Sequence, residues 1–274
     1  MPKDKLTKAP RKKNEDKENK KIENNKQPTK QFVKTGIEGF DKLIEKGIPK
    51  GSAILVAGGA GSGKTIFCLQ ILANMAKEGK KCLYMSFEES EERLRSHMED
   101  FGWNPKELEK NGNLIIKRFS SHDIARAVEA LLAKERGELL IDVEPLILPE
   151  NFKPDFIVVD SLSAIASSFI GREWNYRSYI EQLFRYFERL GVTSFLITET
   201  EETPKIFSPT GVEEFLADGV VVLYNIRKGD IRESAIEIVK MRGSKHLKKV
   251  VAMQIVDKQG IVVYPEQEVF GGIG

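Results

Sequence analysis

The segment from Ala53 to Thr65, AILVAGGAGSGKT, constrains the fold more than any other part of this chain. An apolar run passes through a glycine-rich turn into Lys64 and Thr65, and an apolar pattern with helical spacing follows. This is the pattern G-x-x-x-x-G-K-T in its required context of strand, loop and helix. In such a loop, successive backbone N–H groups and the positive end of a helix dipole converge on one phosphate chain. The segment therefore predicts an α/β domain that binds a nucleoside triphosphate.

The residues of this loop have separate expected roles. Lys64 should reach the β- and γ-phosphates, and the Thr65 hydroxyl should hold Mg²⁺. The alternative is a glycine-rich turn that binds nothing, which the Lys-Thr pair and the flanking periodicities disfavour. The expected nucleotide contacts along the loop are Gly59, Ala60, Gly61, Ser62, Gly63, Lys64, Thr65 and Ile66.

The composition sets limits on the rest of the chain. Its 274 residues suffice for one large α/β domain or two small ones. Charged residues make up 31% and hydrophobic residues 41%. No apolar run is long enough to cross a bilayer, and the N-terminus lacks the apolar segment of a signal peptide. We therefore expect a soluble, cytoplasmic protein with no membrane partner. Cys68 and Cys82 fall on apolar faces, where we expect buried, reduced thiols.

The first 31 residues differ in composition from the remainder. They hold eleven basic and five acidic residues, a net charge of +6, whereas the whole chain carries +2. Too few apolar residues are available there to offset the entropy of ordering the backbone, so residues 1–31 are expected to be a disordered charged tail. A solvated leader fits this composition better than a contact with nucleic acid or an acidic partner. The folded domain is expected over residues 32–265, with a flexible tail at 266–274.

Apolar periodicity and turn residues predict the order of elements. A short helix is expected in residues 35–47, capped by Thr35 or Gly36, and another helix from Thr65 to about Ala76. A polar link is expected after residue 105. Buried strands are expected at 80–87, 114–119, 155–160 and 192–200, and further helices at 90–102, 123–136 and 176–190.

The second half of the chain completes this outline. Residues 137–154 form an apolar stretch interrupted by prolines, which fits either an insertion packed on the sheet edge or a contact surface. From Ala217, short alternating runs with turn signals predict antiparallel hairpin strands. The expected fold class is α/β, with a mostly parallel central sheet flanked by helices and antiparallel hairpins at its C-terminal end. One face of the helix at 176–190 is expected to enter the core through Tyr179, Leu183, Phe187 and Leu190.

Two adjacent acidic residues, Glu88 and Glu89, follow the strand expected at 80–87. An enzyme that hydrolyses a nucleoside triphosphate needs a base or water-orienting group facing the γ-phosphate, and the carboxyl end of a neighbouring strand can deliver one. The alternative is the ordinary enrichment of acids at a helix start. Because Ser90 is the expected cap of the next helix, Glu88 lies before the cap, where the helix dipole explains it less well. We therefore interpret Glu88 as the candidate base.

The run DFIVVD, residues 155–160, ends a short apolar strand on a carboxylate. After a phosphate loop, such an acid organises Mg²⁺ or its water shell, although an apolar run that ends in Asp can also be only a helix cap. The expected metal-site residues are Thr65, Asp160 and Glu88, and the three histidines are too scattered to form a ligand cluster. Thr198 and Glu199 end a later strand near the expected phosphates, where a sensing role and a solvated strand end both remain open.

Several motifs in order resemble the KaiC family of RecA-type ATPases, in its single-domain archaeal form. They cover about residues 32–265 and comprise TGIEGFDKL, the phosphate loop, SFEES, FGW, FIVVDSLSAI, GVEEFLADGVVVL and KMRGSKH. Spaced motifs in a fixed order are more specific than the phosphate loop alone. The resemblance implies a RecA-like P-loop NTPase fold, ATP and Mg²⁺ as cofactors, and a ring, expected to be hexameric, with ATP between protomers.

The resemblance also implies roles for particular residues. Glu88 matches the family's catalytic base and Glu89 its acidic neighbour, and both join Lys64 in the expected catalytic group. The two domains of the circadian members contrast with the one domain here, since this chain shows no internal repeat. Their autophosphorylated Ser-Thr pair falls near Glu214 and Phe215, which carry no hydroxyl. Slow hydrolysis of ATP to ADP and phosphate is therefore expected, and autophosphorylation is not.

In the same family, the KMRGSKH loop at residues 240–246 is offered to the nucleotide of the adjacent protomer. Lys240 and Arg242 would then meet the γ-phosphate, while Met241, Ser244 and His246 would lie near that nucleotide. Cations that arrive from a neighbour would make hydrolysis depend on assembly. The alternative for this loop is a basic surface turn.

Three functional hypotheses follow. The first is an assembled ATPase whose nucleotide state changes a surface for an unidentified protein partner. The second is a DNA-stimulated recombination or repair ATPase, which needs basic loops in the ring channel, whereas the candidate loop at 198–215 is acidic and only the tail supports this idea. The third is a scaffold in which ATP holds the ring together without being hydrolysed.

Overall fold

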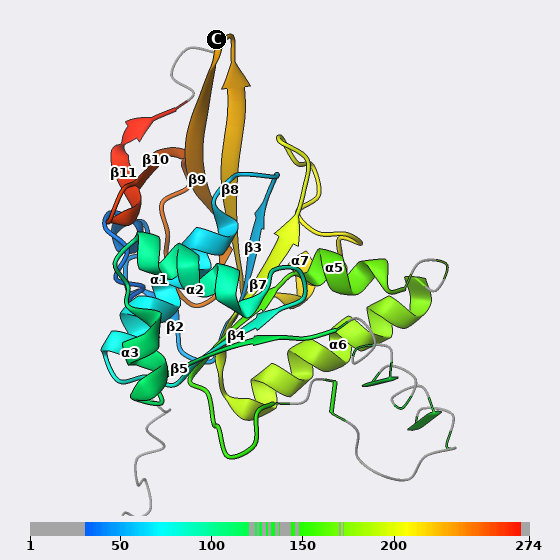
Figure 1. Ribbon diagram of the computed structural model, residues 1–274. Coiled ribbons are helices and arrows are strands. Elements are labelled where there is room, and N and C mark those ends of the chain that lie inside the picture. The colour runs from blue at the N-terminus through cyan, green and yellow to red at the C-terminus, as the bar shows by residue number, and fades with distance from the viewer. Residues whose placement is uncertain are drawn as a thin grey trace, which may run out of the picture. The chain divides into compact units, whose positions relative to one another are not determined.

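Nine of the described strands form one sheet. Figure 1 shows how it is placed among the helices. The computed structural model describes residues 31–120, 148–169 and 173–269, with isolated positions between 124 and 145 and at 171. The strand order is β11-β10-β9-β8-β3-β7-β6-β4-β5. The six strands from β8 to β5 in this order are parallel. They are β3 (Ala53–Gly58), β4 (Cys82–Ser86), β5 (Leu114–Arg118), β6 (Phe156–Asp160), β7 (Thr193–Glu199) and β8 (Gly219–Lys228).

The other end of the sheet is antiparallel, as the alternating pattern after Ala217 predicts. It consists of β9 (Ile231–Met241), β10 (Val251–Val256) and β11 (Gly260–Glu268). The pairing of β8 with β3 stops at Leu223, but the β8–β9 pairing continues to Lys228, so this hairpin projects beyond the sheet edge. Strand β11 continues to Glu268, three residues past the expected end of the domain. A separate two-stranded antiparallel sheet pairs β1 (Phe32–Val33) with β2 (Ile48–Pro49).

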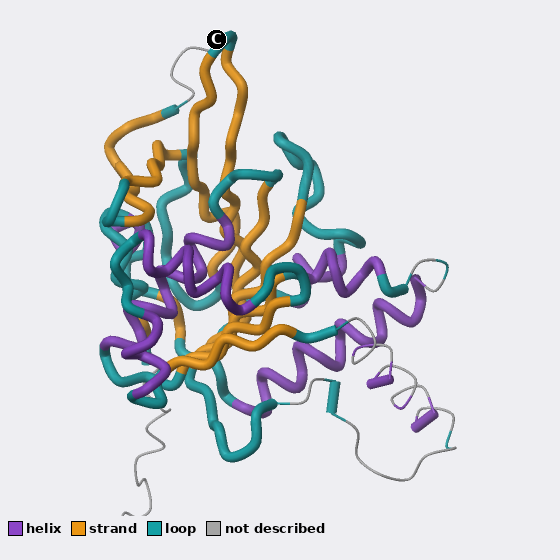
Figure 2. Tube along the Cα trace, in the orientation of Figure 1, coloured by secondary structure: helices purple, strands orange, loops and turns teal. Residues whose placement is uncertain are grey.

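Helices cover both faces of the sheet, as Figure 2 shows. The strands are buried on both sides, and alternate residues of β3 face opposite layers: Ile54 and Val56 lie in one hydrophobic cluster and Leu55 in the other. This agrees with the near-continuous apolar runs that predict parallel strands. The first cluster packs under α1 (Lys64–Lys77), α2 (Glu91–Asp100) and α3 (Pro105–Lys110), and the second under α5 (Leu162–Ser167) and α6 (Glu173–Leu190).

Local capping explains where two helices on the first face begin. The Ser90 hydroxyl accepts a hydrogen bond from the backbone N–H of Arg93, which confirms the expected cap of α2. The polar link expected after residue 105 is wrong, because α3 begins there. The Asn104 side chain accepts from the N–H of Glu107, and Pro105 occupies the first helical position, where its missing N–H costs nothing.

The helix expected in residues 35–47 is also wrong. Only one short 3₁₀ turn, η1 (Phe40–Lys42), forms there. Gly36 and Gly39 adopt positive φ angles of 71° and 79°, and a Cβ atom at Gly39 would lie 1.8 Å from the carbonyl oxygen of Val263. The Asp41 carboxylate accepts hydrogen bonds from Thr35 and Gly36 and holds the segment in a turn. Gly39 is therefore needed for a close approach to β11, and Gly36 for a close approach to the Asn74 side chain of α1, which side chains at these positions would prevent.

Helix α6 forms as predicted but buries one residue fewer than expected. Tyr179, Leu183 and Phe187 lie in the core, whereas Leu190, the last residue of the helix, is 42% exposed. Among the described residues, no helix combines the length and apolarity needed to cross a membrane. The helix expected at 123–136, the stretch 137–147 and both tails fall largely outside the described residues.

The parallel register determines where the polar strand ends meet. Gly58 of β3 pairs with Glu199 of β7, and Ser86 of β4 pairs with Asp160 of β6. The carboxyl ends of these four neighbouring strands therefore lie along one edge of the sheet. Every group that the sequence predicts for one protomer's phosphate and metal site follows one of them.

Candidate functional site

The glycine-rich loop turns from β3 into α1 through backbone conformations that few other residues adopt. Gly61 and Gly63 have φ angles of 71° and 94°, and Gly63 is the residue before the first turn of α1. A Cβ atom at Gly63 would lie 3.1 Å from Ile255, so a side chain there would be both strained and crowded. The loop thus leaves an open backbone cradle at a helix N-terminus, which fits a phosphate chain.

Lys64 lies within this cradle. Its Nζ atom donates hydrogen bonds to the carbonyl oxygens of Gly58 and Gly59, both at 2.9 Å, and the residue is 8% exposed. Burial lowers the pKa of the Lys64 ammonium, while the nearby carboxylates, Glu199 first, raise it. A cation held only by neutral carbonyl groups in a buried site has a strong tendency to pair with an anion.

The predicted metal residues Thr65 and Asp160 are in contact. The Thr65 hydroxyl donates to Oδ2 of Asp160 at 3.1 Å, and the buried hydroxyl of Tyr84 donates to the same oxygen at 2.5 Å. Burial raises the pKa of Asp160 to about 6, and the nearby Glu88 adds to this, whereas the bonds from Tyr84 and Thr65 oppose it. Asp160 is therefore a buried carboxylate, held by hydroxyl groups, next to the phosphate loop.

Glu88 lies where the sequence places the candidate base. Its Oε1 atom accepts a short hydrogen bond from the hydroxyl of Ser161, the residue that follows Asp160. The same Ser161 hydroxyl accepts from the N–H of Ala164 and caps α5. Ser161 therefore links the end of β6 to the end of β4 and holds the Glu88 carboxylate beside the predicted metal residues.

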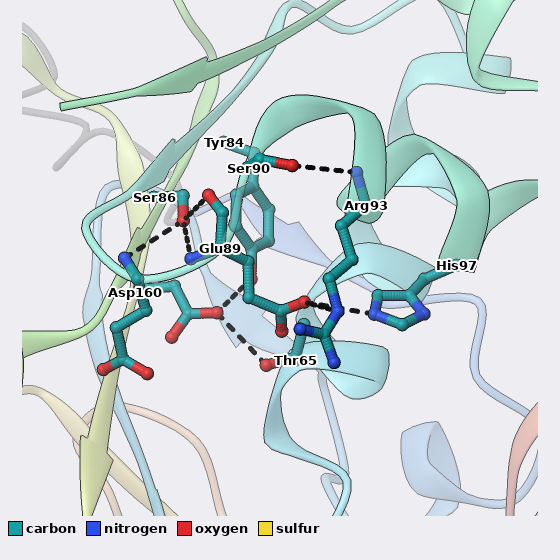
Figure 3. Close-up of polar contacts among 9 residues, drawn as sticks. Thr65, Tyr84, Ser86, Glu89, Ser90, Arg93, His97 and Asp160 are labelled. Atoms are coloured by element: carbon teal, nitrogen blue, oxygen red, sulfur yellow. Dashed lines mark hydrogen bonds and ion pairs between the residues drawn. The ribbon is translucent and has the colours of Figure 1, made fainter.

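Glu89 has different partners from Glu88, although the two are adjacent in sequence. Figure 3 shows its carboxylate between two side chains of α2: Oε2 lies 3.0 Å from Nε of Arg93 and 3.2 Å from Nε2 of His97. The backbone of Glu89 is held as well, since its N–H donates to Ser86 Oγ, which in turn donates to the Glu89 carbonyl. Glu89 is thus fixed to the helix.

These groups line a cavity of about 400 Å³ at the carboxyl edge of the sheet. The cavity brings together the predicted residues of one protomer except Gly59. It also includes Glu199, so this end of β7 is close to the loop, whereas Thr198 is buried and its hydroxyl contacts Ser163. The lining residues are Ala60, Gly61, Ser62, Gly63, Lys64, Thr65, Ile66, Glu88, Glu89, His97, Asp160, Ser161, Ile197, Glu199 and Ile255.

The donor atoms of this cavity fit a divalent cation that arrives with a nucleotide. Among the described residues, no group of three or more His, Cys, Asp or Glu side chains could hold a metal ion on its own. Thr65, Asp160 and Glu88 offer hydroxyl and carboxylate oxygens, which are the ligands that Mg²⁺ prefers. Mg²⁺ also keeps several waters and usually takes further ligands from phosphate oxygens, so a partial protein ligand set suits it.

Comparison with known proteins identifies the family. The sequence model of the KaiC ATPase family matches residues 33–268. The chain belongs to the KaiC family of ATPases. It is 36% identical to circadian clock protein KaiC3 of Synechocystis over 233 residues, which is 85% of this chain and 45% of that protein. It is also 33% identical over 247 residues to a UPF0273 protein of Thermotoga maritima, covering 88% of this chain and 98% of the relative.

A solved structure supports the same assignment. The crystal structure of a KaiC-like protein from the hyperthermophilic archaeon Pyrococcus horikoshii OT3 superimposes with a TM-score of 0.69 at 33% sequence identity, covering 86% of this chain and all of that one. The predicted α/β, RecA-like fold is confirmed. This chain spans about half the length of the circadian clock relatives and contains one nucleotide-binding domain of the KaiC type.

In this KaiC-family domain, Lys240 and Arg242 do not meet the phosphate loop of their own chain. They lie at the far end of β9, where Met241 pairs with Gly219 at the amino end of β8, opposite the edge that carries the loop. Both side chains bind the end of α7 (Val212–Leu216). Lys240 Nζ donates to the carbonyls of Glu214 at 2.9 Å and Ala217 at 2.6 Å, and Arg242 donates to Phe215 at 2.9 Å.

Ser244 and His246 follow these cations on the loop after β9. The loop is fixed by backbone contacts to the segment around η1, including a bridge between Ile44 and His246. The Ser244 hydroxyl and Nε2 of His246 are buried atoms with no hydrogen-bond partner among the described residues. Buried polar atoms of this kind are rare and call for a partner.

Three polar residues at the site are absent from the sequence-based assignment: Ser161 and His97 line the cavity, and Tyr84 lies behind it in contact with Asp160. Ser161 directly follows Asp160, so the sequence places it near the predicted metal site. Only the adjacency of β4 and β6 in the structure shows that its hydroxyl reaches Glu88. His97 lies on α2, one turn after Arg93, and no motif marks it. Tyr84 is part of an apolar run that predicts a core strand, and nothing in the run indicates that its hydroxyl reaches Asp160.

Proposed function

We propose that this chain is a Mg²⁺-dependent ATPase that works as a ring, with a nucleotide state that alters a surface for a protein partner. The observation that carries the proposal is the single cavity in which the open loop, Lys64, the Thr65–Asp160 pair and Glu88 meet. A phosphate-binding loop alone supports only the binding of a nucleotide. The carboxylate held beside it supports hydrolysis, because water attack on the γ-phosphate requires an orienting group there.

Each residue has a distinct role in this proposal. The loop amides and Lys64 bind the phosphate chain and offset its charge, and Thr65 and Asp160 hold the Mg²⁺ that polarises it. Glu88 accepts a hydrogen bond from the attacking water and orients it, while Ser161 keeps Glu88 in place. Glu89, held by Arg93 and His97, fixes the turn between β4 and α2 and does not touch the water.

The cations at the other end of the sheet complete the site in the ring. Lys240 and Arg242 lie too far along β9 to serve their own loop, so in the proposed ring they face the nucleotide of the adjacent protomer. Ser244 and His246, with their unpartnered polar atoms, lie beside them. We propose six protomers by analogy with the circadian relatives. This arrangement makes hydrolysis depend on assembly, since two of the three cationic side chains around the γ-phosphate come from the neighbour.

The acidic segment after β7 argues against a DNA-stimulated role. Glu201 and Glu202 follow Glu199 in the loop that would line a ring channel, Lys205 is the one basic residue within this loop, and nearby Arg232 is paired with Glu202 at 2.8 Å. Such a surface repels phosphates. We propose a protein partner instead, and because Glu214 and Phe215 carry no hydroxyl, we expect no autophosphorylation there.

The test is phosphate release from ATP by the wild type, Lys64→Ala and Glu88→Gln at equal protein concentration, each with and without Mg²⁺. The wild type should release phosphate, and the rate of both variants should be lower by about 100-fold or more. Lys64→Ala should also lose nucleotide binding, whereas Glu88→Gln should retain it. Equal rates in all three would refute the catalytic assignment. Intact ATP after long incubation with a verified wild-type ring would favour the non-hydrolysing scaffold.

A further inference from the structure

Tyr84 lies in the middle of β4 and is completely buried, yet its hydroxyl is directed at the predicted metal site. Strand β4 is adjacent to β6, and Ser86 pairs with Asp160, so the tyrosine ring spans the gap from one strand to the carboxylate at the end of the next. The hydroxyl lies 2.5 Å from Oδ2 of Asp160. Thr65, at the start of α1, donates to the same oxygen at 3.1 Å.

The ring of Tyr84 is accounted for by core packing, but the hydroxyl is not. Cys82 and Tyr84 face the hydrophobic layer under α1, where a phenylalanine would fill the same space. A buried hydroxyl needs an acceptor, and here the acceptor is a buried carboxylate that faces the phosphate cavity. A tyrosine hydroxyl is protonated at neutral pH, so Tyr84 acts as the donor in this contact.

Two donors on one oxygen restrict the carboxylate. With Tyr84 and Thr65 both on Oδ2, rotation of the Asp160 carboxylate breaks at least one bond. No described residue donates a hydrogen bond to Oδ1, which remains available for a metal ion or its water. The donors come from two different elements, β4 and α1, so the carboxylate is braced from both sides before any ligand arrives. Such bracing by partners behind the ligands improves metal affinity in known sites.

We infer that Tyr84 is a positioning residue for the metal site: its hydroxyl orients the Asp160 carboxylate for the Mg²⁺ that accompanies the nucleotide. This inference rests on the proposed function, because it assumes that nucleotide and Mg²⁺ bind in this cavity. It gives a role in metal binding to a residue that lies outside the phosphate loop and outside the acidic strand ends. It also predicts that loss of the hydroxyl weakens Mg²⁺ binding and leaves phosphate binding by the loop unchanged.

The test is the affinity for ADP, measured by titration calorimetry in excess Mg²⁺ and in EDTA, for the wild type and Tyr84→Phe. The ratio of the two affinities reports the contribution of Mg²⁺. Tyr84→Phe should lower this ratio by about tenfold, the usual effect of losing a hydrogen bond to a charged group, and leave ADP binding in EDTA unchanged. An unchanged ratio would overturn the inference. A wild type that binds no ADP, or binds it equally with and without Mg²⁺, would instead overturn the proposed function.

Two comparisons separate positioning from general packing. Tyr179→Phe removes another buried hydroxyl, which donates to the Pro145 carbonyl at 3.1 Å in the other core layer, and should leave the ratio at its wild-type value. In an Asp160→Asn background, Tyr84→Phe should have no further effect on the ratio, because the residue it orients is gone. A full additional loss in that background would contradict the inference.

A further measurement covers the case in which Tyr84→Phe does not fold. Introduction of 3-fluorotyrosine at position 84 retains the hydroxyl and reports its environment by ¹⁹F NMR. Addition of Mg²⁺ to the ADP complex should shift the fluorotyrosine resonance, because the carboxylate that accepts its hydrogen bond then binds a cation. A resonance that does not move at saturating Mg²⁺ would refute the assignment.

Discussion

At the scale of single residues, Asp160 lies in an environment that disfavours its charged form when no ligand is bound. It is 5% exposed, and its partners Tyr84 and Thr65 are neutral hydroxyl groups. Burial raises its pKa from 3.8 to about 6. The ionised carboxylate is therefore less stable in the folded protein than in the unfolded chain, as expected of a site shaped for a cation.

Asp160→Asn should increase the stability of the protein when nucleotide and Mg²⁺ are absent. The raised pKa of Asp160 lowers the free energy of unfolding of the wild type by about 1–3 kcal/mol at pH 8. The uncharged amide of asparagine avoids this loss. Because the folded pKa is above the unfolded value, the cost in the wild type is complete above about pH 6 and vanishes below about pH 4. The measurement is guanidinium unfolding in EDTA at pH 8 and pH 4. A variant that is less stable at pH 8 would contradict this expectation.

Glu88 and Glu89 should respond very differently to the same substitution. Glu88→Gln removes the group proposed to orient water, with a loss of about 100-fold or more in kcat. Glu89→Gln weakens only contacts to the partly exposed Arg93 and His97, so kcat should fall by less than about tenfold. Steady-state kinetics of both variants provide the check, with Glu91→Gln on the same helix as the control. Equal losses at 88 and 89 would assign chemistry to both.

At the scale of elements, the short helix α7 depends on a buried polar network. Glu213 is completely buried and accepts hydrogen bonds from Tyr176 of α6 at 2.6 Å and from Thr210 at 2.9 Å. The carbonyls at the other end of α7 bind Lys240 and Arg242. Five residues are too few for a stable isolated helix, so these contacts hold α7 in place.

Tyr176→Phe should destabilise the protein by about 1–3 kcal/mol, because it leaves a buried carboxylate with one donor fewer. Chemical unfolding measures the loss, and hydrogen exchange should show it first at the amides of α7. Tyr264→Phe is a suitable control, since its hydroxyl contacts Gln254 in an exposed position and its loss should cost less than about 0.5 kcal/mol. Wild-type stability of Tyr176→Phe would mean that α7 is held by packing alone.

At the scale of the whole molecule, the sheet separates the two halves of the proposed site. The phosphate loop and Glu88 follow the carboxyl ends of parallel strands, while Lys240 and Arg242 lie near the amino end of β8. One chain cannot bring these groups together without dismantling the β8–β9 pairing. Under the proposed function, the complete site would therefore need two copies, arranged head to tail as in a closed ring.

Mixing two inactive variants should restore activity. The Lys64→Ala variant lacks the cation of the phosphate loop, and the Arg242→Ala variant lacks the cation that is offered to the neighbour. In rings formed from equal amounts of the two, about a quarter of the interfaces combine an intact Lys64 with an intact Arg242. The mixture should release phosphate at roughly that share of the wild-type rate. In the control, Lys64→Ala is mixed with the Lys64→Ala/Arg242→Ala double variant and should stay inactive. Failure of the first mixture, with mixed rings verified by mass measurement, would exclude a shared site.

Prediction from the sequence succeeded where a residue's role depends on its neighbours along the chain. The apolar runs of β3, β4, β6 and β7, the cap at Ser90 and the hairpin strands after Ala217 all follow local patterns. It failed where a distant element decided the outcome. The segment at 35–47 has an acceptable helical pattern, but contact with β11 and the conformations of its glycines favour a turn.

By itself, the sequence determined that the fold is a parallel α/β sheet carrying a phosphate loop, because strand periodicity and the loop pattern are local properties that need no partner. Only the tertiary structure decided how the polar strand ends combine. It joined Tyr84 to Asp160 and Ser161 to Glu88. It gave Glu89 different partners from Glu88 and placed the Lys240 loop far from the phosphate loop. The reason is that these relations depend on strand order and register, which bring residues more than 70 positions apart within hydrogen-bond distance.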